Sequence, residues 1–171
     1  RLPKFSLSFF RTQIAEGSML PSGKMPYEVF IPAYRDEILS DTVMVYGNVD
    51  EVELVLNGKT IRRQTADKGP DSDYIPVPNG GNGKNLHFPP FTFYGVPKER
   101  GVLEAVGYHQ GKKVAEYTVK TPGVPERLDI TYFESGKPAT KNDLLIVYVR
   151  MLDKQGVLCP VNGIPVELSV Q

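Results

Sequence analysis

The sequence predicts an all-β fold, and two observations carry that prediction. Apolar and polar side chains alternate with a period of two in most segments after residue 26, which is typical of strands with one buried face. Turn signals separate these segments. Asn57-Gly58 tolerates the positive φ angles of a two-residue hairpin turn, and Gly111 stands where a second hairpin needs a glycine.

The alternating segments between residues 26 and 122 predict an immunoglobulin-like β-sandwich, because short strands with closely spaced turn signals are typical of that fold. We expect its strands at 27–35, 42–47, 50–56, 59–64, 90–94, 101–109 and 112–120. In the third of these, Val52 and Leu54 face the core while Glu51 and Glu53 lie on the solvent side. We therefore expect these carboxylates to be solvated, and we predict no catalytic residue in the chain.

Residues 1–16 have a helical pattern instead. Leu2, Phe5 and Phe9 recur at i, i+3 and i+7, which predicts a short amphipathic helix of roughly fourteen residues. A helix of that length is marginal alone in water, so its phenylalanines need a surface to dock on. We expect that surface to lie upstream, outside this chain. Residues 17–25 are rich in glycine, serine and proline and predict a linker.

The C-terminal third begins with a proline-punctuated segment, 121–128, which we interpret as a stiff linker. Alternating patterns follow at 127–134, 144–153 and 164–170, and we expect Tyr132 and Tyr148 within them to pack in a core or between domains. Three strands in so short a segment rarely bury enough apolar surface to stand alone. We therefore interpret residues 123–171 as an incomplete second β domain, or as one that borrows a face from the first sandwich.

Composition excludes several functions. Twenty basic residues balance twenty acidic ones, so no overall field favours a nucleic acid or an anionic membrane as partner. No apolar run approaches the ~20 residues of a membrane-spanning helix. The single cysteine, Cys159, excludes an internal disulfide, and His87 and His109 lack the spacing of zinc ligands. We expect Cys159 to be a buried packing residue, and we expect no cofactor.

Residues 67–90 form the most irregular segment and exceed the ~15 residues usual for a loop in a compact domain. Three interpretations stay open. The first is a flexible surface loop, favoured by the asparagine and glycine run at 79–83. The second is a sugar contact through ring faces and amides, made by Tyr74, Asn79, Asn82, Asn85, His87 and Phe88. The third is a calcium site, because carboxylate oxygens suit a hard cation, made by Asp67, Asp71 and Asp73.

Two stretches carry a resemblance to a known family. They are VMVYGNVDEVELVLNGKTI (43–61) and GVLEAVGYHQGKKVAEYTVKTPGVPERLDI (101–130), preceded by RLPKFSLSFF at the start of the chain. Together they resemble the C-terminal region of family 2 glycoside hydrolases, the β-galactosidase-like enzymes. The resemblance implies that residues 1–16 are the last helix of a catalytic (β/α)8 barrel, that 26–122 form the sandwich, and that 123–171 belong to an immunoglobulin- or adhesin-like β domain.

The resemblance also implies a function. Such enzymes are retaining and use two glutamates on barrel strands, and neither barrel strand is in this chain. We therefore expect a non-catalytic accessory region that supports the domain arrangement and access of an oligosaccharide substrate, with the upstream barrel of the same polypeptide as partner. The family resemblance favours a periplasmic or secreted location. The alternatives are a carbohydrate-binding module that uses the 67–90 loop, and an adhesin-type spacer.

Overall fold

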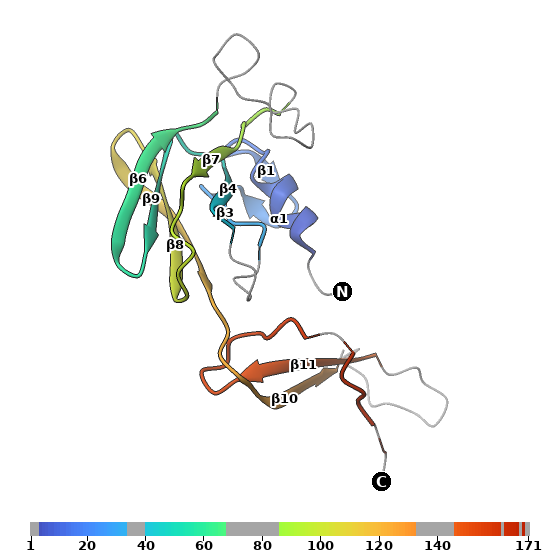
Figure 1. The fold of residues 1–171 in the computed structure, drawn as a ribbon. Coiled ribbons are helices and arrows are strands. Elements are labelled where there is room, and N and C mark those ends of the chain that lie inside the picture. Colours follow the sequence, from blue (N-terminus) through green and yellow to red (C-terminus); the bar gives the residue numbers. More distant parts are fainter. Residues whose placement is uncertain are drawn as a thin grey trace. The chain divides into compact units, whose positions relative to one another are not determined.

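The computed structural model describes residues 4–33, 40–67, 86–132, 146–161, 163–167 and 169. In these ranges it contains one short helix and strands that form four sheets, so the all-β prediction is confirmed (Figure 1). The chain divides into two compact units, Arg1–Lys120 and Thr121–Gln171. Among the described residues, no helix has the length and hydropathy that a membrane crossing needs.

Two antiparallel sheets make the sandwich of the first unit. The smaller has the strand order β3-β4-β7, and the larger has the order β6-β5-β8-β9. Their bounds are β3 Val29–Phe30, β4 Thr42–Gly47, β5 Glu51–Leu56, β6 Lys59–Thr65, β7 Phe91–Tyr94, β8 Val102–His109 and β9 Lys112–Lys120. The two predicted hairpin turns connect β5 to β6 and β8 to β9. Each has positive φ at both central residues, 52° and 77° at Asn57-Gly58 and 49° and 77° at Gln110-Gly111.

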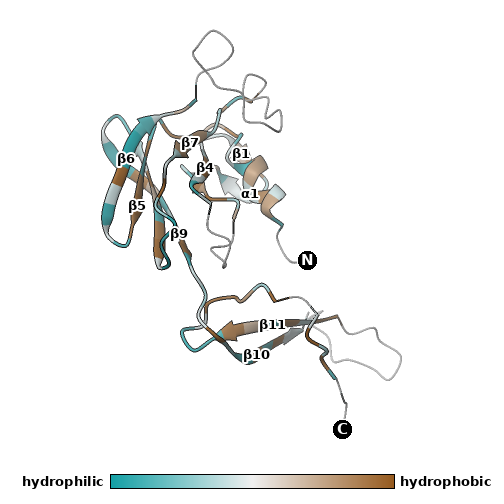
Figure 2. Cartoon of the chain, viewed as in Figure 1, coloured by the Kyte–Doolittle hydropathy of each residue, from teal (hydrophilic) through white to brown (hydrophobic). Residues whose placement is uncertain are grey.

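The core of this unit draws on both sheets. Val52, Leu54 and Leu56 of β5 are buried, as the alternation predicts, and they join buried side chains of β4, β7 and β8 in one cluster. Phe91 and Phe93 of β7 are its largest fully buried members. Each such side chain contributes about 1.5–3 kcal/mol to folding through burial. The edge strand β6 is largely hydrophilic and mostly exposed (Figure 2).

The sheets approach one another closely around Val29. A Cβ atom on Gly47 of β4 would lie 2.9 Å from Val29 Cγ1, and one on Gly107 of β8 would lie 2.8 Å from the same methyl group. Real Cβ atoms essentially never come so close to a neighbour. The absence of a side chain at both glycines therefore makes room for Val29 in the core.

The N-terminal helix α1, Phe5–Arg11, is shorter than the sequence predicts and docks on the sandwich. The Phe5 ring meets Phe30 edge-on with 5.5 Å between centroids, and Phe9 meets Tyr46 in the same way at 4.9 Å. The expectation that these phenylalanines dock only upstream is therefore wrong. The segment expected as a linker, 17–25, contains a small hairpin of β1 (Met19–Leu20) and β2 (Gly23–Lys24).

The second unit contains one antiparallel ribbon, β10 (Pro125–Tyr132) paired with β11 (Val147–Asp153). The strand expected at 164–170 is wrong for residues 163–167 and 169, which are not in a strand. The linker expected at 121–128 is also too long, because β10 begins at Pro125. A proline is tolerated as the first residue of a strand, where its missing N–H breaks no ladder.

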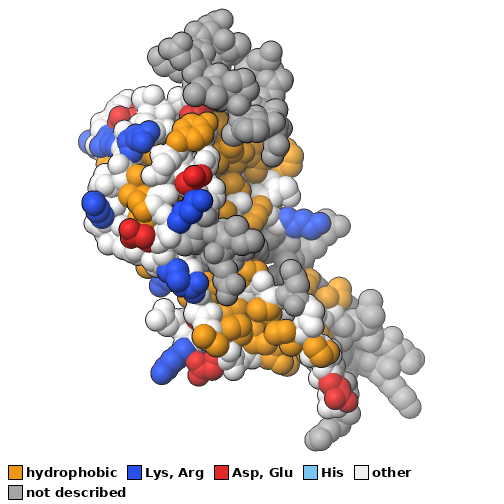
Figure 3. Space-filling view, viewed as in Figure 1, with side chains coloured by type: hydrophobic (Ala, Val, Ile, Leu, Met, Phe, Trp, Pro, Cys, Tyr) orange, Lys and Arg blue, Asp and Glu red, His pale blue; other side chains and the backbone are white. Residues whose placement is uncertain are grey.

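One face of this ribbon is apolar. Facing side chains in an antiparallel pair lie on the same side, and the register places three apolar pairs there: Leu128 with Met151, Ile130 with Val149, and Tyr132 with Val147. Hydrophobic side chains gather over this unit in the space-filling view (Figure 3). Tyr132 is 56% exposed, so it does not lie in a core of the described residues, where no second layer of strands covers it. Its packing between domains stays a prediction.

Candidate functional site

The proposed sugar contacts are only partly within the described chain. His87 and Phe88 are described, whereas Tyr74, Asn79, Asn82 and Asn85 lie outside the described residues. The His87 ring is exposed and meets the Phe88 ring edge-on at 4.6 Å. The side-chain amide of Gln13 accepts from the Phe88 nitrogen at 3.1 Å and donates to the Phe88 oxygen at 3.0 Å. This short segment is thereby anchored to the N-terminal part of the chain.

Asp67, the described member of the calcium candidates, has a structural partner. Its carboxylate accepts hydrogen bonds from the main-chain nitrogen of Thr92, at 3.1 Å, and from the Thr92 hydroxyl. Asp71 and Asp73 lie outside the described residues. Within the described residues, no group of three or more histidine, cysteine or acidic side chains could hold a metal ion. The calcium hypothesis therefore has no support from Asp67, whose oxygens serve Thr92.

Glu51 and Glu53 take part in a polar network on the outer face of the larger sheet. Glu53 accepts hydrogen bonds from the hydroxyls of Thr60 and Tyr108, both at 2.7 Å, and these bonds lower the pKa of its carboxyl group. Glu51 pairs with Arg63, whose guanidinium lies 3.7 Å from the centre of the Tyr108 ring. A general acid at neutral pH needs a raised pKa, so the environment of Glu53 works against that role.

Cys159 is buried in the second unit. Burial is the main cause of its raised pKa, and the charge of Asp153 raises the pKa further. A thiol with a raised pKa stays protonated and is a weak nucleophile. The expectation of a buried cysteine is confirmed, and its chemistry is that of a small packing group.

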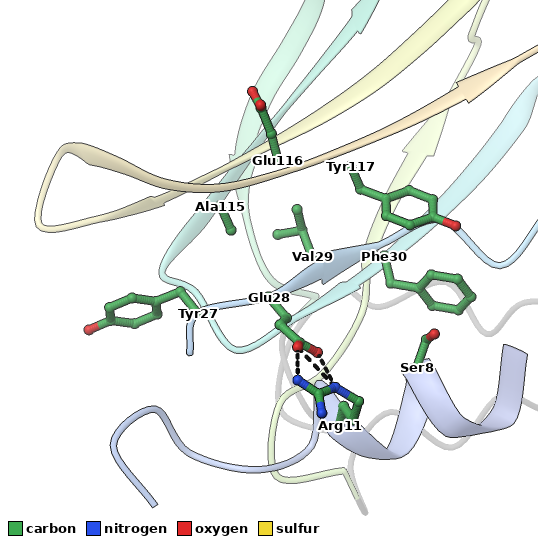
Figure 4. A pocket seen from close by; sticks show the side chains of 9 residues that line it. All are labelled: Ser8, Arg11, Tyr27, Glu28, Val29, Phe30, Ala115, Glu116 and Tyr117. Carbon is green, nitrogen blue, oxygen red and sulfur yellow. Dashed lines mark hydrogen bonds and ion pairs between the residues drawn. The ribbon is translucent and has the colours of Figure 1, made fainter. Parts of the chain in front are cut away.

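An open groove lies between α1, the segment around β3, and β9 (Figure 4). Its volume is about 330 Å³. Its lining combines polar and aromatic side chains from three elements that are distant in sequence: Ser8, Arg11, Tyr27, Glu28, Val29, Phe30, Ala115, Glu116 and Tyr117. Phe30 and Tyr117 meet edge-on at 5.3 Å. Sequence reasoning missed this groove, because no local pattern indicates that α1 packs beside β9.

An ion pair forms the polar side of the groove. Arg11 Nε lies 2.9 Å and 3.0 Å from the two carboxylate oxygens of Glu28, and an Nη group of Arg11 contacts the same carboxylate. The hydrogen bond to Glu28 raises the pKa of Arg11, so the guanidinium stays charged. Both side chains are partly exposed, and together they add no net charge to the groove.

Asn48 holds the N-terminal segment in place, and sequence reasoning missed it as well. Its Nδ2 group donates to the main-chain oxygens of Ile14 and Pro26, both at 3.0 Å. Its Oδ1 atom accepts from the Glu28 nitrogen at 2.6 Å. An asparagine between two strands indicates a turn, and nothing local indicates three long-range bonds. Asn48 thereby positions Glu28 beside Arg11.

The fold and these contacts define the class: an all-β chain with an immunoglobulin-like sandwich and a docked N-terminal helix. Comparison with known proteins adds what the chain is similar to. A family model described as a domain of unknown function, DUF4982, matches residues 40–115. The chain is 29% identical over its whole length to a β-galactosidase of Thermoanaerobacter pseudethanolicus, and 32% identical over 74% of its length to a β-galactosidase of Bacteroides ovatus.

Solved structures agree. A β-glucuronidase from glycoside hydrolase family 2 matches 94% of the chain with a TM-score of 0.70 at 22% identity, which shows the fold. A family 2 glycosyl hydrolase from Bacteroides cellulosilyticus matches 68% of the chain with a TM-score of 0.52 at 28% identity. The chain spans 14% of each of these proteins, and 22% and 13% of the two β-galactosidases. These matches fit the C-terminal region of a family 2 glycoside hydrolase, so the resemblance predicted from the sequence is confirmed.

Proposed function

We propose that this chain is a non-catalytic accessory region of a β-galactosidase-like glycoside hydrolase. In this role it supports a catalytic (β/α)8 barrel of the same polypeptide and helps to shape the access of an oligosaccharide substrate. The matches to small parts of much larger family 2 enzymes support the larger polypeptide. The carboxylates of Glu51, Glu53 and Asp67 bond to neighbouring residues of the sandwich, which supports a structural role for this region.

The observation that carries this proposal is that α1 has apolar side chains on two sides, of which one packs on the sandwich and the other is exposed. Phe5 and Phe9 pack on aromatic residues of the sandwich, as described above. Leu7 and Phe10 project from the same helix into solvent, with 53% and 64% of their surface exposed. A short helix that is apolar on both sides is typical of an element buried between two bodies. The sandwich is one body, and we propose the barrel as the other.

The second unit fits the same proposal. Its apolar ribbon face, defined by Leu128, Ile130 and Tyr132 with their partners in β11, is too exposed for a finished core. A two-stranded ribbon is at best marginally stable without a layer packed on it. We propose that residues 123–171 are part of a larger β domain whose other strands belong to the same polypeptide.

Two measurements test the accessory role. The 171-residue chain alone is expected to leave nitrophenyl galactosides and glucuronides unhydrolysed, and steady turnover by the purified chain would make it an enzyme. In the complete polypeptide, Leu7→Ser with Phe10→Ser is expected to speed thermal inactivation, since each burial contributes about 1.5–3 kcal/mol. Ser6→Ala on the same helix is the matched control. Equal inactivation rates for the wild type, the double variant and Ser6→Ala would mean that α1 does not pack on the barrel.

A carbohydrate-binding module remains the second candidate function. It is supported by the exposed His87 ring against Phe88, in a segment that Gln13 anchors. Anchored rings lose little freedom on binding a sugar, which favours affinity. Polysaccharide binding that His87→Ala abolishes and that His109→Ala leaves intact would favour this function.

A further inference from the structure

The groove between α1, β3 and β9 has one apolar and one polar side, both drawn from the first unit. On the apolar side, Phe30 and Tyr117 stand edge-on, next to Val29 and Ala115 (Figure 4). Val29 and Phe30 are only 5% and 3% exposed and form the floor of the groove, so the ring of the less buried Tyr117 is the surface against which C–H groups pack. Ser8, Arg11 and Glu28 provide hydrogen-bonding groups on the opposite side.

The polar side retains unused bonding capacity. Among the described residues, no hydrogen-bond partner is found for the Ser8 hydroxyl, which points from α1 toward the groove (Figure 4). The Glu28 carboxylate is fixed by Arg11, yet a carboxylate has about four lone-pair sites, so it can accept further bonds from a ligand. Asn48 fixes the Glu28 main chain through a 2.6 Å bond. The site is thus held in shape without a ligand.

Charge restricts what the groove can hold. Arg11 and Glu28 neutralise each other, and the remaining charged lining residue, Glu116, points away from the groove and pairs with Lys113 at 2.5 Å. A net-neutral site has no excess charge to offset the desolvation of an ionic ligand. It suits a neutral molecule whose hydroxyls both donate and accept. The volume of about 330 Å³ lies at the small end of the ~300–1,000 Å³ usual for ligand sites.

We propose that this groove binds a single neutral sugar ring of the pyranose type. The C–H face of the ring packs against Tyr117. Adjacent ring hydroxyls donate to Glu28 and exchange hydrogen bonds with Ser8. None of the described residues that line this groove belongs to the 67–90 segment. The inference also stands apart from the accessory role, because a binding groove in the first unit requires no barrel.

Titration of the 171-residue chain with methyl β-galactopyranoside tests the proposal by heteronuclear NMR. We expect saturable shifts at millimolar ligand, confined to amides near Ser8, Glu28 and Tyr117. Methyl β-galactopyranosiduronic acid, which adds a carboxylate, is expected to bind several-fold more weakly. Ser8→Ala is expected to weaken binding of the neutral sugar about three- to tenfold, as the loss of one neutral hydrogen bond does.

Ser6→Ala is the matched control, since Ser6 is on the same helix, is exposed and does not line the groove. It is expected to keep the wild-type affinity. Three outcomes would overturn the proposal: no shifts at high millimolar sugar, equal affinity in the two serine variants, or shifts centred on His87 and Phe88. The last of these would favour the loop as the sugar site. None of the three would decide whether α1 docks on a barrel.

Discussion

The side chain of Asn48 donates a hydrogen bond to the main-chain oxygen of Ile14, 34 residues earlier in the sequence. The Asn48 side chain is buried, with 3% of the residue exposed, and its three bonds are partly buried. Asn48→Ala would leave the Ile14 and Pro26 oxygens and the Glu28 nitrogen without this partner. We expect a loss of about 1–3 kcal/mol in the free energy of unfolding, the cost of leaving buried polar groups unpaired.

Urea denaturation of the Asn48→Ala chain measures this loss, with Gln13→Ala as comparison. Gln13 is less buried than Asn48 and makes two bonds to Phe88 instead of three, so its removal is expected to cost less. If the two variants lose the same stability, the three Asn48 bonds are not the main link to the N-terminal segment.

Gly107 and Val29 are expected to be energetically coupled. A Cβ at Gly107 would lie 2.8 Å from Val29 Cγ1, so Gly107→Ala overpacks the core and is expected to cost about 1–3 kcal/mol. Val29→Ala removes the clashing methyl group. In the double variant, the cost of Gly107→Ala should fall but not vanish, because the new Cβ would still lie 3.0 Å from Val49 Cγ1. A double-mutant cycle of unfolding free energies measures the difference. Strictly additive costs would contradict this packing account.

Asp153 is expected to make the second unit sensitive to acid. Its carboxylate accepts bonds from the main-chain nitrogens of Gly123 at 2.6 Å and of Gln155 and Val157, both at 2.8 Å. These bonds, that from Gly123 first, lower the pKa of Asp153 below its ordinary value. The folded state therefore favours the ionised form. The contribution of the Asp153 carboxylate to folding stability is fully present above the ordinary aspartate pKa of about 3.9. It is lost as the pH falls through the lower pKa that Asp153 has in the folded state.

The amide resonance of Gly123, followed by NMR between neutral and strongly acidic pH, reports this titration. Asp153→Asn is expected to destabilise the second unit at neutral pH and to remove the acid-dependent change. Asp129→Asn is the control, because it loses only an exposed ion pair with Arg150. This variant should still show the acid-dependent change. An acid transition that persists in Asp153→Asn would assign it to another group.

Glu53 is expected to control the ionisation of Tyr108. The hydrogen bond from the Tyr108 hydroxyl to Glu53 is the largest cause of the raised pKa of Tyr108. Glu53→Gln removes the negative charge, so the pKa of Tyr108 should fall toward its ordinary value. Ring-labelled tyrosine NMR at alkaline pH measures it. Glu51→Gln is the control, because Glu51 faces Tyr108 across the strand pair but its carboxylate bonds to Arg63, whereas the Tyr108 hydroxyl donates to Glu53. An equal fall in the pKa of Tyr108 in Glu51→Gln would contradict a specific bond to Glu53.

Local patterns in the sequence determined much of the fold. The alternation of Val52, Leu54 and Leu56 with charged residues determined which face of β5 is buried, because strand side chains point to opposite faces in turn. Asn57-Gly58 determined one hairpin turn, since few pairs tolerate two positive φ angles, and Gly111 determined the second, in which Gln110 also has a positive φ of 49°. The hairpin and strand motifs also carried the family resemblance. Each of these signals lies within a dozen or so neighbouring residues.

Only the tertiary structure decided where α1 ends and what it touches, and which residues form the groove. The helix pattern continues past Arg11, but the Ile14 oxygen bonds to Asn48, and this long-range bond competes with another helical turn. Arg11 meets Glu28, and Phe30 meets Tyr117, across separations that no local pattern encodes. Alternation fixes the face on which a side chain lies, whereas its partner depends on how whole elements pack.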